Sequence, residues 1–468
     1  MSRWTMSEVV KATGGRLVHG LSDAGISNIS IDSRSVSSGE CFVAIKGQRH
    51  DGHMFIAEAV NRGVPGIVAA EEFYSNYSFS ADKTSFVSVR DTQKALGDLG
   101  AWRRQRMGIP VVAITGTNGK TTTKEMTAAV LGQSYKVLAT AGNFNNLIGV
   151  PLTLLRLEDS HAIAVIELGM NAPGEIRELT RITRPDIGVI TNIGSGHIEG
   201  LGTIDGVMKA KGELFDGMQE NGIAVINADD KRVKALEDRF RGRTLRYGIE
   251  SPDADVAATD VRIQGTGYSF RLTIGQEAAE IRLPLAGRFN IHNALAAATV
   301  GYHFNVPVQD IRNALERMEP VEKRMQLIRL ANGVTLINDT YNANPESMSQ
   351  AIETLCALKK DDRGIAVLGD MLELGDYSFE AHQETGKQVA RSSADYLFAT
   401  GGHAHVLTGS AVDAGMKAEQ TMAGAHEEIA GALKEIISPH DWLLVKGSRG
   451  MAMEKIVDEL VSFYGLKN

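Results

Sequence analysis

Short apolar runs rich in β-branched residues recur through the middle of the chain. They occupy residues 111–114, 163–166, 187–190 and 223–226. Each run precedes a turn signal or a helical stretch, an alternation that is typical of a parallel sheet covered by helices. Similar runs at residues 365–368 and 443–445 predict a second α/β unit near the C-terminus.

Residues 256–285 follow a different pattern, in which apolar positions recur with a period of two between glycine-containing breaks. This pattern predicts a small antiparallel meander. Polar or charged seams lie near residues 74–80 and 316–324. At about 150 residues per domain, the length suggests three domains, which we place at residues 1–84, 85–320 and 321–468.

Composition narrows the class of protein. Of the 468 residues, 43% are hydrophobic, and 49 Lys and Arg against 57 Asp and Glu give a net charge of −8. A mildly acidic chain is not typical of a nucleic-acid or membrane-surface binder. The two cysteines, Cys41 and Cys356, lie too far apart in sequence to suggest a disulfide scaffold or a Cys-rich zinc site.

The sequence also bears on location. No run approaches the 18 apolar residues of a membrane span, and the first residues lack the apolar core of a signal peptide. We therefore expect a cytoplasmic protein with no membrane or nucleic-acid partner, and we expect a monomer.

The most specific motif is the segment Gly116-Thr-Asn-Gly119-Lys120-Thr121, which lies between a predicted strand and a predicted helix. Glycines let backbone N–H groups surround phosphate oxygens, and the start of a helix adds a favourable dipole. Lys120 can reach the outer phosphates and the Thr121 hydroxyl can bind Mg²⁺. The usual first glycine of a phosphate loop is replaced by Ile114. An ordinary strand–turn–helix joint is the alternative, but the coincidence of all these features favours a nucleoside triphosphate.

Two further residues follow predicted strands. Glu167 ends the run at 163–166, at the edge where ligands bind in α/β folds, although such a glutamate more often caps a helix or faces solvent. His197 and Glu199 suggest a zinc deaminase, but the chain has no Pro-Cys-x-x-Cys segment. The segment that starts at His426 lacks the second histidine of a metalloprotease helix.

The phosphate-loop segment resembles the ATP loop of the Mur ligases, a family that includes folylpolyglutamate synthases. Those enzymes join a carboxylate to an amine through an acyl phosphate, in three domains. The resemblance implies a three-domain α/β fold. Residues 1–84 would form a small UDP-substrate domain, and residues 85–320 a central ATP-binding domain with a parallel sheet and a small antiparallel sheet. Residues 321–468 would form a Rossmann-like domain that binds the incoming dipeptide and closes over ATP.

The resemblance also implies site residues and cofactors. Lys120, His197 and Lys211 would be catalytic, and Thr121, Glu167, His197 and Lys211 would bind two Mg²⁺ ions. The family has a carbamylated lysine here; Lys209 and Lys211 are both candidates, and we prefer Lys211 for its context. Asn290 would contact adenine, Arg324 a phosphate and Asp339 the ribose. The full ATP-binding set is Gly116, Thr117, Asn118, Gly119, Lys120, Thr121, Thr122, Asn290, Arg324 and Asp339.

Three segments resemble the family member that adds D-alanyl-D-alanine to a UDP-N-acetylmuramoyl-tripeptide. They are residues 32–53, residues 142–153, and residues 339–348 with 369–375 and 446–451. The implied contacts to the UDP substrate are Ser33, Arg34, Asp51, His53, Asn143 and Asn146. The implied contacts to the dipeptide are Asn342, Asn344, Lys446 and Ser448.

Two alternatives stay open. A folylpolyglutamate-type enzyme would use the same ATP residues, but that family typically begins near its ATP loop, and this chain has an additional N-terminal segment. A nucleotide-binding switch without ligase chemistry would have little use for Glu167, His197 and a paired lysine. The third residue of the tripeptide, meso-diaminopimelate or L-lysine, is not fixed by the sequence.

Overall fold

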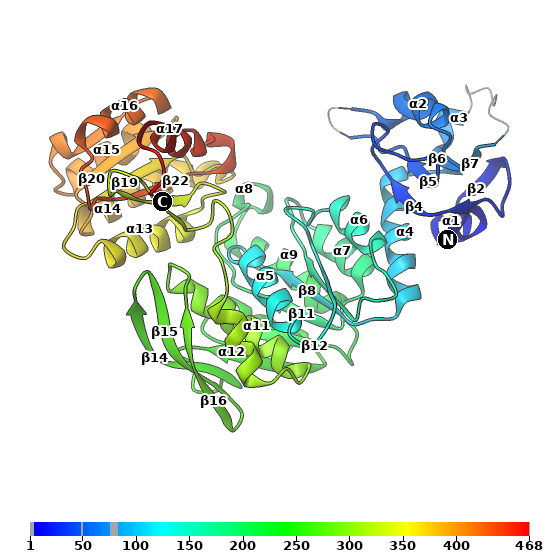
Figure 1. The fold of residues 1–468 in the computed structure, drawn as a ribbon, viewed down its shortest axis with the longest axis horizontal. Coiled ribbons are helices and arrows are strands. Elements are labelled where there is room, and N and C mark those ends of the chain that lie inside the picture. Colours follow the sequence, from blue (N-terminus) through cyan, green and yellow to red (C-terminus); the bar gives the residue numbers. More distant parts are fainter. Residues whose placement is uncertain (1–3, 48–49, 75–82, 468) are drawn as a thin grey trace.

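The computed structural model describes residues 4–47, 50–74 and 83–467, and its chain forms three successive parts (Figure 1). Most of the polar seam predicted at residues 74–80 lies outside the described residues. The N-terminal part is coloured blue, the central part cyan to green, and the C-terminal part yellow to red. The three-domain α/β architecture that the resemblance implies is confirmed.

The N-terminal part is a mostly parallel sheet with helices on it. Its strands run in the order β2-β7-β6-β5-β4, and only the β2–β7 pair is antiparallel. The strands are β2 (Arg16–His19), β4 (Asn28–Ser30), β5 (Glu40–Val43), β6 (Gly66–Ala70) and β7 (Ser85–Val89). The other elements are β1 (Trp4–Thr5), β3 (Gly25–Ile26), α1 (Met6–Thr13), α2 (Ile56–Asn61) and α3 (Glu71–Tyr74). Strand β7 therefore joins this sheet just beyond the boundary proposed at residue 84.

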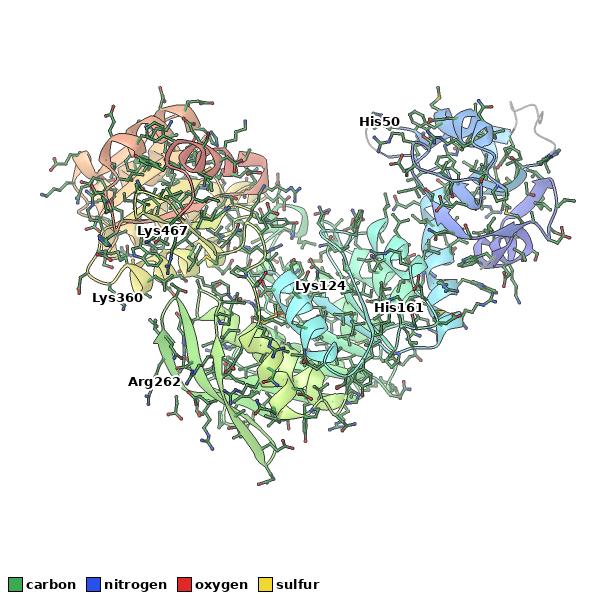
Figure 2. The ribbon with its side chains drawn as sticks, in the orientation of Figure 1. His50, Lys124, His161, Arg262, Lys360 and Lys467 are labelled. Atoms are coloured by element: carbon green, nitrogen blue, oxygen red, sulfur yellow. The ribbon has the colours of Figure 1, made fainter. Side chains whose placement is uncertain are left out.

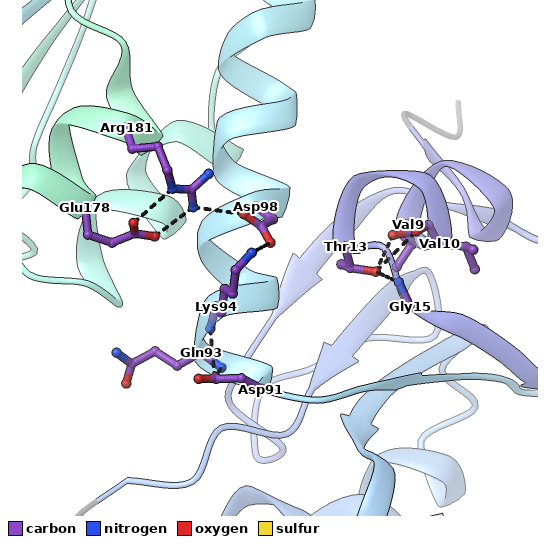
Figure 3. Close-up of polar contacts among 10 residues, drawn as sticks. All are labelled: Val9, Val10, Thr13, Gly15, Asp91, Gln93, Lys94, Asp98, Glu178 and Arg181. Carbon is purple, nitrogen blue, oxygen red and sulfur yellow. Dashed lines mark hydrogen bonds and ion pairs between the residues drawn. The ribbon is translucent and has the colours of Figure 1, made fainter. Parts of the chain in front are cut away.

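Helix α4 (Thr92–Met107) connects the N-terminal sheet to the central part (Figure 3). Its N-cap is Asp91, whose carboxylate accepts from the backbone N–H groups of residues 93 and 94 at 2.8 and 2.9 Å. Asp98 on the same helix accepts from Lys94 and from Arg181 of the central part, at 2.6 and 2.8 Å. The connecting helix is thus tied to the central part by charge-assisted contacts.

The central sheet has the order β16-β15-β14-β13-β12-β11-β8-β10-β9. Its strands are β8 (Val111–Thr115), β9 (Val137–Ala139), β10 (Ile163–Glu167), β11 (Ile187–Ile190), β12 (Ile223–Asn227), β13 (Arg243–Gly248), β14 (Val256–Gln264), β15 (Gly267–Ile274) and β16 (Glu277–Leu283). Pairs from β9 to β14 are parallel, and β14, β15 and β16 form the predicted antiparallel meander as a continuation of the same sheet.

The order of this sheet reverses at β8, which lies between β10 and β11. Ligands of α/β folds bind in the crevice at such a point, outside the carboxyl ends of the strands. Apolar clusters cover both faces of the sheet. The helices are α5 (Lys120–Leu131), α6 (Gly149–Leu155), α7 (Glu175–Thr183), α8 (Ile198–Leu201), α9 (Ile204–Gly217), α10 (Lys231–Leu236), α11 (Phe289–His303) and α12 (Val308–Glu316).

The C-terminal part is the second α/β unit that the sequence predicts. Its strand order is β17-β18-β22-β19-β20-β21, and only the β17–β18 pair is antiparallel. The strands are β17 (Gln326–Arg329), β18 (Thr335–Asp339), β19 (Gly364–Gly369), β20 (Tyr396–Thr400), β21 (Thr421–Ala423) and β22 (Trp442–Lys446). The helices are α13 (Pro345–Lys359), α14 (Ser378–Arg391), α15 (Ala404–Asp413), α16 (His426–Ile436) and α17 (Glu454–Tyr464). Among the described residues, no helix is both long and apolar enough to cross a membrane.

Candidate active site

A cavity of about 290 Å³ lies between the central and C-terminal parts, at the carboxyl ends of strands from both sheets. Most of the residues proposed from the sequence for ATP, metal and dipeptide line it, together with Asn143 and Asn146, which were proposed for the UDP substrate. They are Thr117, Asn118, Gly119, Lys120, Thr122, Asn143, Asn146, Glu167, His197, Lys211, Asn290, Arg324, Asp339, Asn342, Asn344 and Lys446. The structure therefore brings together residues from segments more than 300 positions apart.

The phosphate-loop residues form the turn between β8 and α5. Gly116 has φ +150°, and a Cβ there would lie 1.9 Å from the Thr191 hydroxyl oxygen. Gly119 has φ +80° and precedes the first residue of α5, so its conformation is one that other residues rarely adopt. A Cβ at Gly119 would lie 2.4 Å from Asn293 Oδ1. Both glycines are therefore required by this loop shape.

Two residues that follow β11, neither of them predicted as a site residue from the sequence, form hydrogen bonds to the loop. Asn192 accepts from the Asn118 N–H at 2.8 Å and donates to the Asn118 carbonyl at 3.0 Å. The Thr191 hydroxyl donates to the same carbonyl at 2.6 Å. Their position directly after a buried strand was the available signal, but the partner lies more than 70 residues away.

Two lysine ammonium groups meet at one carbonyl of the loop. Lys120 Nζ donates to the carbonyls of Gly116 and Thr117 at 2.8 and 3.0 Å, and Lys211 Nζ donates to the Gly116 carbonyl at 2.9 Å. Burial lowers the pKa of Lys120 to about 8, opposed by the charge of Glu167. Burial, reinforced by the charge of Lys120, lowers the pKa of Lys211 well below its usual value. The other candidate, Lys209, is exposed on α9.

The carboxylate of Glu167 fits a hard divalent cation. Glu167 is 2% exposed, and its Oε1 accepts from Asn145 Nδ2 at 2.7 Å. Its Oε2 is buried and has no hydrogen-bond partner among the described residues. A buried carboxylate oxygen left without a donor is costly unless a cation binds it, and oxygen ligands are those that Mg²⁺ prefers. Nearby, the Thr121 hydroxyl accepts from Arg324 Nη2 at 3.0 Å.

His197 lies at the start of α8 with φ +64°, and its ring faces the C-terminal part. Its Nδ1 pairs with Glu373 Oε2 at 2.6 Å, and this hydrogen bond lowers the pKa of Glu373. Glu373 was not among the residues predicted from the sequence. In this arrangement His197 links the two parts of the protein through Nδ1, which leaves Nε2 as its other possible ligand atom.

A buried lysine contacts the chain just before the segment that carries Asn143 and Asn146. Lys124 of α5 lies inside the central part (Figure 2) and donates to the Thr140 carbonyl at 2.8 Å. Thr140 Oγ1 in turn accepts from the Glu167 N–H at 3.0 Å. Asn146 uses its side-chain oxygen to accept from backbone N–H groups at the start of α6, at 3.1 and 2.9 Å.

The C-terminal wall of the cavity is formed by the ends of β18 and β22. Asp339 pairs with Lys446, and its Oδ1 accepts from the Met325 N–H at 3.1 Å. Lys446 also donates to the Asn342 carbonyl at 3.0 Å. The guanidinium of Arg324 lies 4.0 Å from the ring centre of Tyr341. This wall therefore presents two cations and a carboxylate toward the phosphate loop.

Three residues proposed for this site lie just behind its lining. The Gly116 carbonyl holds the two lysines, and Thr121 contacts Arg324. Ser448 is buried, donates to the Ala343 carbonyl at 3.2 Å and accepts from the Leu372 N–H at 2.8 Å.

Asn290, proposed for adenine, is buried at the start of α11. Its Nδ2 donates to the Ala286 carbonyl at 2.7 Å, and its Oδ1 accepts from Asn293 Nδ2 at 2.9 Å. It lines the cavity with its hydrogen bonds already made within the central part.

The residues proposed for the UDP substrate in the N-terminal part do not line this cavity. Asp51 and His53 line a separate cavity of about 450 Å³, and their side chains pair at 2.6 Å. Ser33 is buried and donates to Glu58 at 3.1 Å, whereas the exposed Arg34 pairs with Asp32 at 2.8 Å. The structure thus places the proposed UDP contacts in two groups on different parts, with Asn143 and Asn146 at the central cavity.

A second cluster of potential metal ligands lies in the C-terminal part, where Asp370, His382 and His403 approach one another. The two imidazole rings are stacked at 4.3 Å with an interplanar angle of 11°. A metal ion lies close to the plane of each histidine ring that binds it, and two parallel, separated planes share no such position. His382 also uses both ring nitrogens, with the Ser378 carbonyl at 2.6 Å and the Met371 N–H at 2.9 Å. His382 therefore has no free ring nitrogen for a metal ion, whereas His403 Nδ1 is buried without a hydrogen-bond partner among the described residues.

Models of known protein families match successive parts of the chain. The model described as "Mur ligase family, catalytic domain" matches residues 25–104. The "Mur ligase middle domain" model matches residues 114–301, and the "Mur ligase, glutamate ligase domain" model matches residues 323–449. Together these matches extend over the phosphate loop and both walls of the cavity.

Individual relatives agree over nearly the full length. A UDP-N-acetylmuramoyl-tripeptide–D-alanyl-D-alanine ligase of Escherichia coli is 36% identical over 457 residues, 97% of this chain and 98% of the relative. A crystal structure of MurF from Acinetobacter baumannii has a TM-score of 0.90 at 33% identity and covers 98% of this chain and 99% of its own. The MurF ligase from Thermotoga maritima in complex with ADP has a TM-score of 0.82 at 28% identity, over 93% of this chain and 97% of its own.

Proposed function

This chain belongs to the Mur ligase family, and from that premise we propose that it joins D-alanyl-D-alanine to a UDP-N-acetylmuramoyl-tripeptide at the expense of ATP. The product is the UDP-linked pentapeptide precursor of peptidoglycan. The observation that carries the proposal is the cavity in which the phosphate loop faces Arg324, Asp339 and Lys446 of the C-terminal part. Full-length similarity to a relative named for this reaction supports the choice of substrates.

The reaction has two steps. The C-terminal carboxylate of the tripeptide attacks the γ-phosphorus of ATP, so that a new P–O bond forms, the bond to ADP breaks, and an acyl phosphate results. The amine of the dipeptide then attacks the acyl carbon, the amide bond forms, and inorganic phosphate leaves after the nitrogen loses a proton. Lys120 and Arg324, which both line the cavity, would offset negative charge on the phosphates.

The residues of the cavity would also hold Mg²⁺. We assign Thr121 and Glu167 to one ion, because Glu167 Oε2 is a buried oxygen without a donor among the described residues. His197 would bind a second ion, and carbamylated Lys211 would bridge the pair. Ions bound there would neutralise charge on the transferred phosphoryl group. The protein's own residues orient the phosphates and exclude water from the acyl phosphate.

Lys211 acts in this scheme as a carbamate. Its lowered pKa favours the neutral amine, which is the form that attacks carbon dioxide. A C–N bond forms, one carbon–oxygen π pair becomes the carbamate anion, and the amine proton leaves to solvent. The modification turns a cation into an oxygen ligand. It also removes the repulsion between Lys211 and Lys120.

Each of the three parts is assigned a different set of ligand contacts. We propose that residues 1–84 hold the UDP portion with Ser33, Arg34, Asp51 and His53, and that Asn143 and Asn146 of the central part extend this contact. Residues 85–320 bind ATP, including adenine through Asn290. Residues 321–468 bind the ribose and the dipeptide, the latter through Asn342, Asn344, Lys446 and Ser448. A monomeric state and a cytoplasmic location remain predictions.

The test is phosphate release from ATP and Mg²⁺ with UDP-N-acetylmuramoyl-tripeptide and D-alanyl-D-alanine, each omitted in turn. We expect release only with both substrates, and a product heavier than the tripeptide by one dipeptide minus one water. Parallel reactions with meso-diaminopimelate- and L-lysine-containing tripeptides identify the third residue. If the protein binds ATP but neither tripeptide stimulates phosphate release, the substrate assignment is refuted. Phosphate release with folates and glutamate would then indicate a folylpolyglutamate-type reaction.

A further inference from the structure

The first turn of α13, in the C-terminal part, contacts the central part directly. Asn344, the N-cap residue of this helix, exchanges two hydrogen bonds with Asn118 of the phosphate loop, at 3.2 and 2.8 Å. Two residues further on, the carboxylate of Glu346 accepts from both the N–H and the hydroxyl of Ser195, at 2.9 and 2.7 Å. Hydrogen bonds to a charged acceptor are about twice as strong as those between neutral groups.

Ser195 belongs to the segment of residues 191–197 that supports the phosphate loop. The N–H of its neighbour Gly194 donates to the Thr117 hydroxyl at 2.9 Å, and Thr117 N donates to the Asn192 carbonyl at 3.0 Å. His197 lies two residues after Ser195. A side chain that holds Ser195 therefore acts on a segment connected to both the phosphate loop and His197.

The close approach of Glu346 is built into the segment that receives it. A Cβ at Gly194 would lie 2.8 Å from the carboxyl carbon of Glu346 and 3.0 Å from both of its oxygens. A larger residue at position 194 would force the carboxylate to shift from this position. The carboxylate also lies in the first turn of α13, where the helix dipole favours negative charge. The hydrogen bonds to Ser195 and the dipole of α13 therefore both favour a negatively charged Glu346 at this position.

We propose that Glu346 is a positioning residue for the reaction. By holding Ser195, it fixes the C-terminal part against the 191–197 segment and keeps Asn344 and Lys446 over the phosphate loop. This proposal rests on the proposed function, because it concerns the step that the two parts perform together. Its role is positioning because the described contacts of Glu346 are to Ser195 and not to the phosphate loop itself.

The experiment compares variants of the full chain in the phosphate-release assay with both substrates. The variants are Glu346→Ala, Ser195→Ala, the double variant and Glu346→Gln. The matched control is Glu353→Ala, because Glu353 is an exposed glutamate on the same helix whose carboxylate accepts a hydrogen bond from Ser349 of that helix at 3.3 Å. X-ray scattering of each variant without substrates measures the radius of gyration.

We expect Glu346→Ala to lower kcat about tenfold, since loss of hydrogen bonds to a charged group has this size. Ser195→Ala keeps the backbone N–H donor and should lower kcat by a smaller factor. In both variants KM for ATP should change less than about threefold. The double variant should lose no more activity than Glu346→Ala alone, because that variant already removes both hydrogen bonds of the contact. Glu346→Gln, which still offers one acceptor and one donor, should recover most of the activity. Glu346→Ala, unlike Glu353→Ala, should have a larger radius of gyration than the wild type.

A kcat for Glu346→Ala within twofold of the wild type, or losses that multiply in the double variant, would overturn the proposal. If Glu346→Ala melts below the control, Ser195→Ala and Ser195→Gly test the same contact from the other side. A wild-type protein that releases no phosphate would instead refute the proposed function. In that case the radius of gyration alone decides whether Glu346 holds the two parts together.

Discussion

Lys120 is expected to make the protein less stable in the absence of nucleotide, and this cost can be measured. Its ammonium is confined beside Lys211 and Arg324, with two backbone carbonyls as its hydrogen-bond partners. Moving a lysine pKa from 10.5 to about 8 costs about 3 kcal/mol of folding free energy while the lysine is charged. We expect this cost to vanish in a Lys120→Met variant, which keeps the length of the side chain without the charge.

The variant also loses a hydrogen bond. The Gly116 carbonyl keeps Lys211 as a donor, but the Thr117 carbonyl loses its lysine partner, at a cost of about 1 kcal/mol. The net gain is about 2 kcal/mol. For a domain of the size of the central part this corresponds to a rise in Tm of about 4–8 °C at pH 7.

The sign of the pH dependence follows from the lowered pKa. Below about pH 8 Lys120 is charged in both the folded and unfolded states, so the full cost is present. Between about pH 8 and 10.5 the folded state loses the proton first, and the cost disappears as the pH rises. The Tm advantage of Lys120→Met should therefore shrink over this range.

The assay is calorimetry of both proteins with EDTA at pH 7, 8.5 and 10, repeated at pH 7 with ADP and Mg²⁺. Lys209→Met, which removes an exposed lysine on α9, is the matched control and should leave Tm unchanged. We expect ADP with Mg²⁺ to raise the Tm of the wild type more than that of Lys120→Met. A Lys120→Met protein that is less stable than the wild type at pH 7, by a margin independent of pH, would refute this reasoning.

Three further outcomes are expected. Glu167→Gln keeps the shape of the side chain but removes its charge, so it should raise the Mg²⁺ concentration for half-maximal phosphate release at least about tenfold. An unchanged Mg²⁺ titration would contradict the metal assignment. Lys211→Arg cannot carry a carbamate and should lower kcat at least about 100-fold. With ¹³C-bicarbonate, only the wild type should give a carbamate NMR signal, and a signal that persists in the variant would place the modification at another residue. Burial raises the pKa of Cys41 to about 12, so a thiol reagent at pH 8 should modify the partly exposed Cys356 first in the folded protein, and equal rates measured by mass spectrometry would contradict the burial of Cys41.

Much of the fold follows from local patterns. The parallel strands β8, β10, β11 and β12 are continuous apolar runs because both of their faces are buried. Strand β13 was not predicted, because it is not a continuous apolar run and contains arginines at positions 243 and 246. Its place beside β12 depends on pairing with a neighbour and not on its own composition.

The site residues likewise fall into those that local sequence patterns predict and those that they do not. Lys120 was found from the phosphate-loop motif. Glu167 and His197 were found because one ends a recognisable strand and the other lies shortly after one, so that the local pattern predicts the edge of the sheet on which they lie. Glu346 and Glu373 were not proposed as site residues, because their partners Ser195 and His197 belong to another part of the chain. A contact between two domains has no periodicity along either segment, and only the folded structure brings its members together.

The polar contacts in and near the cavity are of two kinds: those that substrate binding would replace and those that it would leave intact. Arg324 on Thr121 and Lys120 on the loop carbonyls engage the groups that are proposed to bind phosphate or Mg²⁺. Binding of ATP would exchange these contacts for new ones, so their loss offsets part of the affinity gained. The Glu346–Ser195 contact lies outside the proposed ligand set, and substrate binding can leave it intact. The protein can therefore keep its central and C-terminal parts together while the charged groups between them change partners, which lowers the ordering cost of each catalytic cycle.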